Sequence, residues 1–99
     1  MNQDDLNRAI VVYVGKGFAK APMPDKARLA HEMGPAFARE AMPHIAALLD
    51  EMSAIPVDWQ AMDLNAATDH VIAAMQTRHP ELSQAALDAL DWLYSWVNR

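Results

Sequence analysis

Apolar residues recur at steps of three and four along almost the whole chain, and this spacing is the feature that most constrains the fold. A three- to four-residue step places side chains on one face of an α-helix, whereas a half-buried strand requires strict alternation. Alanine, leucine and methionine, which favour helices, dominate the apolar residues. The sequence therefore predicts an all-α fold, a small bundle of four to five helices.

The chain has 99 residues and no cysteine. A chain of this length forms one core, so we expect a single helical domain over residues 1–99. Without disulfides or thiolate metal sites, packing alone must hold that core, and a reducing cytosol is the compartment that fits best. No basic stretch precedes an apolar segment at the N-terminus, and the longest apolar run, residues 9–15, is far shorter than the ~20 residues of a membrane span. We therefore expect a cytoplasmic protein with no membrane partner.

The first predicted helix runs from about residue 5 to residue 20. Its apolar face contains Leu6, Ile10, Tyr13, Val14 and Phe18. Residues 10–14 are mostly β-branched and are followed by Gly15-Lys16-Gly17, so a short strand or hairpin is the main alternative. The glycine spacing in that segment does not match a phosphate-binding loop, and we interpret it as a turn or a helix C-cap.

Prolines mark where the next helices begin, end or bend. Pro24 is suited to begin a short helix, and the Gly34-Pro35 pair to end it and start the next one. This next helix is long, over about residues 35–53, and its apolar arc contains Phe37, Ala41, Ile45, Leu48, Leu49 and Met52. Pro43 lies on the opposite, polar arc, where water can replace the lost hydrogen bond, so we expect a kink there and not a helix end.

Two further helices are predicted in the second half. The first begins at Asp58 or Asp63, either of which can act as a cap, and ends near Arg78. Its core stripe contains Leu64, Ala67, Val71 and Met75. The last helix has the clearest start, because Ser83 supplies a capping oxygen and leucines before and after it are spaced for a hydrophobic staple.

The last helix is apolar around more than half of its circumference. Its polar residues form one narrow strip, which contains Gln84, Asp88, Asp91, Ser95 and Asn98. A terminal helix lying on one bundle face buries only ~100–140° of its circumference, so a central position or another chain must cover the rest.

Trp92 and Trp96 lie four residues apart at the edge of this apolar arc, next to Asp88 and Asp91. Aromatic residues flanked by charges at the rim of an apolar face are typical of the hot spots that recognise another protein. The competing interpretation is that both indoles belong to the core.

The formal net charge is −5. Residues 1–40 carry six bases and five acids, whereas residues 41–99 carry two bases and eight acids, so the acidic character belongs to the second half. This balance argues against binding to nucleic acid, which depends on Lys and Arg replacing counterions along the phosphates. An acidic face either steers a basic partner or keeps a small domain soluble.

No set of residues has the spacing of a catalytic or metal site. Glu40 and His44 share a helix face, but a zinc site needs at least one more protein ligand. Acid pairs such as Asp50/Glu51 and Asp88/Asp91 lie on predicted solvent faces, where a carboxyl group lacks the burial that shifts its pKa. We therefore predict no enzymatic activity, no metal and no cofactor.

Small acidic helical proteins that bind and block a toxin or a nuclease share this format of length, charge and absence of catalytic motifs. The leading hypothesis is therefore a non-enzymatic, bacterial-type binding protein of the immunity or inhibitor kind, which neutralises a basic protein partner. Its candidate partner-binding residues are Asp88, Asp91, Trp92, Trp96 and Trp59. The alternatives are a homodimer formed through the C-terminal helix and, third, a small metal-dependent enzyme with converging His44, His70 or carboxylates.

Overall fold

The computed structural model describes all residues from Met1 to Arg99 and contains five helices and no strand. In chain order the helices are α1 (Gln3–Val14), α2 (Lys26–Met33), α3 (Pro35–Ala54), α4 (Leu64–Arg78) and α5 (Gln84–Val97). The predicted all-α bundle is therefore confirmed. One cluster of buried side chains draws members from every helix, so the five helices share a single core.

Most helix starts are fixed by a polar side chain that accepts a hydrogen bond from a backbone N–H of the first turn. The capping residues are Asn2, Asp25, Asp63 and Ser83. The predicted cap at Ser83 is confirmed, and the leucines on either side of it are buried. Of the two predicted starts for α4, the chain uses Asp63, while Asp58 instead accepts a hydrogen bond from Gln60 N–H in the preceding turn.

The first helix is shorter than predicted: it ends at Val14 and does not continue to residue 20. Gly15 adopts a φ of +96°, the left-handed conformation that commonly ends a helix, and its N–H donates to the Val11 carbonyl. Phe18, expected on the core face, therefore lies outside the helix and is 51% exposed. The strand alternative is reduced to one isolated bridge between Lys16 and Ala19.

Arg28 on α2 holds the C-terminal end of α1. Its Nη1 donates to the carbonyl oxygens of Val12, Tyr13 and Met23 at 3.3, 3.4 and 3.0 Å. Carbonyls in the last turn of a helix have no partner within the helix, so they need donors from elsewhere. A guanidinium is well suited to this role because it carries several donors and a charge that favours the negative end of the helix dipole.

The second helix begins two residues later than predicted, at Lys26 and not at Pro24. The reason is Asp25, whose side chain accepts hydrogen bonds from the N–H groups of Ala27 and Arg28 and so makes Asp25 the cap. The predicted stop and restart at Gly34-Pro35 is confirmed, since α2 ends at Met33 and α3 begins at Pro35.

The long third helix continues through Pro43, as predicted from the position of that proline on the exposed side. Its buried residues are Ala38, Ala41, Ile45, Leu48 and Met52. Phe37 and Leu49, expected in the same arc, are half-buried and pack against the core.

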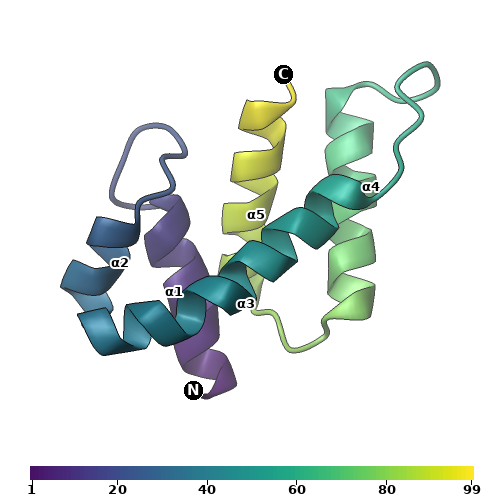
Figure 1. Ribbon diagram of the computed structural model, residues 1–99. Helices are drawn as coiled ribbons and strands as arrows, with labels where there is room; N and C mark the ends of the chain where they lie inside the picture. The colour runs from purple at the N-terminus through teal and green to yellow at the C-terminus, as the bar shows by residue number, and fades with distance from the viewer.

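The last helix occupies the central position in the bundle. It packs against α1 on one side and α4 on the other, and Figure 1 shows it between these two helices. Asn7 on α1 ties the start of α5 in place, because its Nδ2 donates to the Glu81 carbonyl and its Oδ1 accepts from Ser83 N–H, both at 3.0 Å. The wide apolar arc predicted for this helix is thus covered on two sides within the chain.

Candidate functional site

The two tryptophans of α5 have different environments. Trp92 is half-buried and packs against the core, whereas Trp96, one turn further along, is 40% exposed. Arg99 lies over the Trp96 ring, with its guanidinium carbon 3.6 Å from the ring centroid. One face of the Trp96 indole therefore already contacts a cation, which is the kind of group that a basic partner would offer.

Asp91 on α5 corrects an expectation from the sequence, which predicts it on a solvent face without a shifted pKa, because packing leaves it half-buried. Burial raises the pKa of Asp91 above its ordinary value, and the negative charges of Asp69 and Asp88 raise it further, while Lys16 acts weakly in the opposite direction. None of the three aspartates forms an ion pair, and the one side-chain hydrogen bond among them runs from Gln84 Nε2 to Asp88 Oδ1. We call these three residues, Asp69, Asp88 and Asp91, the aspartate cluster.

The structure places most of the predicted site residues on one helix and Trp59 elsewhere. Asp88, Asp91, Trp92 and Trp96 all belong to α5, and Asp88 is exposed while Asp91 is half-buried. Trp59 is 49% exposed in the connection between α3 and α4. Figure 1 shows this connection on the side of α4 that faces away from α5. Sequence reasoning missed Asp69, because its approach to α5 depends on how α4 packs.

A second group of charged residues joins α3 to the connection between α4 and α5. His79 contacts Glu51 at 2.9 Å through Nε2 and Glu81 at 3.3 Å through Nδ1, and Arg78 contacts Glu51 at 3.3 Å. The hydrogen bond from His79 is the main cause that lowers the pKa of Glu51, with a smaller contribution from Arg78. An imidazole donates through both nitrogens only when it is protonated, so this geometry suits a positively charged His79.

This group corrects one expectation from the sequence. Glu51 was placed on a solvent face without a shifted pKa, but it is half-buried and paired, because α3 crosses the end of α4. A groove of about 240 Å³ beside it is also lined by His44. No three His, Asp or Glu side chains come together in a way that could hold a metal ion.

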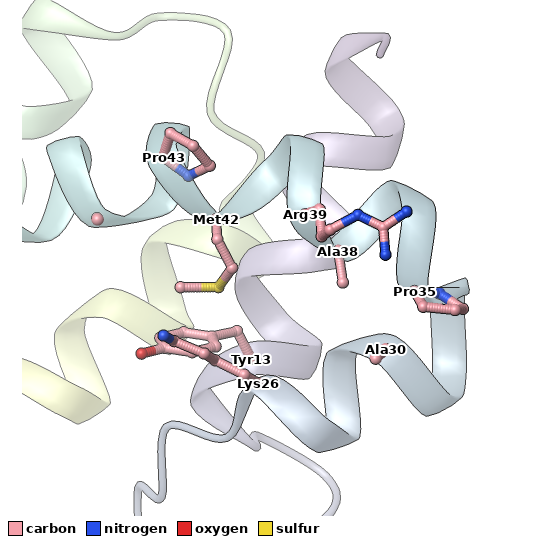
Figure 2. A pocket seen from close by; sticks show the side chains of 9 residues that line it. Tyr13, Lys26, Ala30, Pro35, Ala38, Arg39, Met42 and Pro43 are labelled. Carbon is pink, nitrogen blue, oxygen red and sulfur yellow. The ribbon is translucent and has the colours of Figure 1, made fainter.

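The largest groove lies between α2 and α3 and is also lined by Tyr13 of α1. It has a volume of about 810 Å³, and Figure 2 shows the side chains that line it. Its apolar lining consists of Ala30, Pro35, Ala38, Met42, Pro43 and Ala46. Its polar lining consists of Tyr13, Lys26 and Arg39. We call this the α2–α3 groove.

A comparison of the chain with protein-family models, with curated proteins and with solved structures finds no match. None of the five helices combines the length and the apolar character that crossing a membrane requires.

Proposed function

We propose that this chain is a non-enzymatic protein-binding domain of the immunity or inhibitor kind, which neutralises a basic protein through the acidic face of α4 and α5. The observation that carries the proposal is the aspartate cluster, in which burial and the repulsion from Asp69 and Asp88 raise the pKa of Asp91, and no carboxylate has a cation in ion-pair contact. A basic side chain from a partner would relieve that repulsion, so binding energy is available at this face.

The tryptophans supply the apolar part of the proposed interface. Trp96 is exposed on α5, the helix that also carries Asp88 and Asp91, and Trp92, one turn earlier, is half-buried against the core. Large aromatic side chains contribute most to binding when the contacts around them exclude water. Trp59 would contact only a partner broad enough to reach across α4.

The central position of α5 supports a separate partner over self-association. The wide apolar arc of α5, which a second copy of the chain could have covered, is covered by α1 and α4. The large apolar side chains of α5 that stay exposed are Trp96 and Val97 at its C-terminal end. The absence of cysteine and the acidic composition fit a bacterial cytoplasmic protein, which is part of the same proposal.

The test compares two triple variants that change the net charge equally, from −5 to −2. The first, Asp69→Asn/Asp88→Asn/Asp91→Asn, removes the charge of the aspartate cluster. The control, Asp4→Asn/Asp5→Asn/Asp50→Asn, removes three exposed charges elsewhere. Each protein is immobilised, a bacterial lysate is passed over it at low and high salt, and captured proteins are identified by mass spectrometry.

We expect one basic protein to be retained by the wild type and the control, lost from the cluster variant, and released by salt because exposed charges are screened. Its purified form should then bind at least ~10-fold more weakly to Trp96→Ala, the usual size of a hot-spot effect. Equal retention by both triple variants would refute the role of the cluster. Light scattering of the wild type alone, showing a dimer at all concentrations, would favour self-association instead.

A further inference from the structure

The α2–α3 groove carries the opposite charge from the proposed acidic face. Apart from the Tyr13 phenol, the ionisable side chains that line it are Lys26 and Arg39, and no carboxylate lines it. Neither cation forms an ion pair or a hydrogen bond within the chain. In a chain of net charge −5, this is a local surplus of positive charge beside an apolar surface.

Nearby carboxylates are directed elsewhere. Asp25 caps α2 through hydrogen bonds to backbone N–H groups, and Glu40 lies 3.5 Å from the N-terminal ammonium. Glu32 lies two residues after Ala30, a groove residue, and so points about 200° away from it around α2. Both cations are therefore free to meet an acidic ligand.

The shape of the groove favours a helix as that ligand. The α3 residues that line it run from Pro35 to Ala46, about three helical turns or ~16 Å. Three of the six apolar lining residues are alanines, which let another backbone approach closely. In Figure 2, Met42 extends from α3 toward Tyr13 and Lys26, while Arg39 lies toward the other end near Pro35.

An open groove of this kind does not suit a small molecule. Small ligands are usually held in pockets that bury ~70–90% of their surface. A partner helix needs only one face covered, and acidic residues flanking that face could reach Lys26 at one end and Arg39 at the other.

The geometry points to a second interaction surface: the α2–α3 groove binds an acidic amphipathic helix of a partner protein. Its apolar face rests on Met42 and the alanines, and its carboxylates pair with Lys26 and Arg39. This site is separate from the acidic face and has the opposite charge preference, so it does not depend on the proposed function.

The test uses a fluorescein-labelled peptide of about 16 residues, long enough for the groove. Leucines at steps of three and four form its apolar face, and glutamates flank that face. A matched peptide carries lysines in place of the glutamates. Binding is followed by fluorescence anisotropy at about 0.15 M salt, where the Debye length is ~8 Å and the overall repulsion between two acidic chains is largely screened.

Two variants probe the groove and two serve as controls. Lys26→Glu/Arg39→Glu reverses its charge, and Ala46→Glu adds a carboxylate at an exposed lining position. Arg8→Glu/Lys20→Glu makes the same charge change at exposed positions outside the groove. The aspartate cluster variant tests independence from the acidic face.

We expect saturable binding of the acidic peptide to the wild type, weakened at least ~10-fold by the groove double variant and several-fold by Ala46→Glu. Both control variants should bind the acidic peptide as the wild type does. The lysine peptide should not bind at the α2–α3 groove of the wild type. Equal loss in the Arg8/Lys20 control would show non-specific attraction and overturn the site. Absence of saturable peptide binding would overturn the choice of a helix. The same conclusion would follow if the wild type bound no peptide but bound one equivalent of dodecanoate, a small amphipathic anion.

Discussion

Charged side chains differ between the two halves of the molecule: Arg28 is hydrogen-bonded within the chain, whereas the aspartate cluster has no ion-pair partner. Near the N-terminus, the charge of Arg28 lies between α1 and α2 and is met by three carbonyl oxygens, so it holds the fold together. On α4 and α5, the aspartate cluster has no ion-pair partner within the chain, and burial together with the charges of Asp69 and Asp88 raises the pKa of Asp91. The difference indicates which charges serve structure and which are available to another molecule.

Removing the structural charge should have the largest effect. Arg28→Met removes the side-chain donor of the Val12 carbonyl at the end of α1 and of the Met23 carbonyl in the following loop. Hydrogen bonds to a charged group contribute ~1.5–3 kcal/mol, so we expect the free energy of unfolding to fall by about 2–3 kcal/mol. Urea denaturation followed by circular dichroism measures this change. Arg8→Met, at an exposed position, should stay within ~0.5 kcal/mol, and a similar loss in both variants would contradict the role of Arg28.

Substitutions of Gly15 and Gly17 test the same structural role of Arg28. A Cβ on Gly15 would lie 2.7 Å from Arg28 Nη1, whereas a Cβ on Gly17 would meet nothing within 4 Å. Both glycines have positive φ, so both alanine variants bear a backbone cost of ~1–2 kcal/mol. We expect Gly15→Ala to be the more destabilising in thermal melts, because it also displaces the guanidinium. Equal melting temperatures would show that Arg28 moves away at no cost.

Glu51 on α3 pairs with Arg78 and His79, and the effect of this pairing on stability should depend on pH. The folded pKa of Glu51 is lowered by His79, so its stabilising contribution is present above its unfolded pKa, near 4.5, and is lost as pH falls through the lower folded pKa. We expect Glu51→Gln to be less stable than wild type at pH 6 and to converge with it in strong acid. A constant difference across urea melts from about pH 6 to pH 2 would contradict this account.

Asp91 should show the smallest effect, with the opposite sign. Its folded pKa is raised, so stability is fully present below its unfolded pKa and declines as pH rises through the folded value. Asp91→Asn should therefore stabilise the protein at pH 7 by no more than ~0.5 kcal/mol, the usual range for surface changes. Asp50→Asn is the matched control at an exposed site. A loss of stability in Asp91→Asn would mean that the carboxylate is not strained.

Local patterns predicted the helices and most of their starts, because a cap or a proline acts within one turn. They overextended α1, since the apolar Phe18 continued the period while the backbone had already turned at Gly15. The contacts of Arg28 and Asn7 join residues 16 and 76 positions apart, so no local spacing reveals them.

The candidate site was predictable only in part. A helical wheel placed Trp92 and Trp96 together, but the neighbouring helices decide that the first is half-buried and the second exposed. Asp69 and the pairing of Glu51 with His79 depend on how α3, α4 and α5 cross. The α2–α3 groove likewise exists only once two helices are packed, although each of its lining residues stands in the sequence.

The hydrogen bonds of Asn7 also bear on how the chain folds during synthesis. Ser83 is synthesised 76 positions after its partner Asn7, which takes roughly 4–15 s at ~5–20 residues per second. During that interval the apolar face of α1 lacks the helix that will cover it. The packing of α1 is therefore expected to be completed only after α5 has been synthesised, and the exposed face of α1 is where a nascent chain would recruit a chaperone.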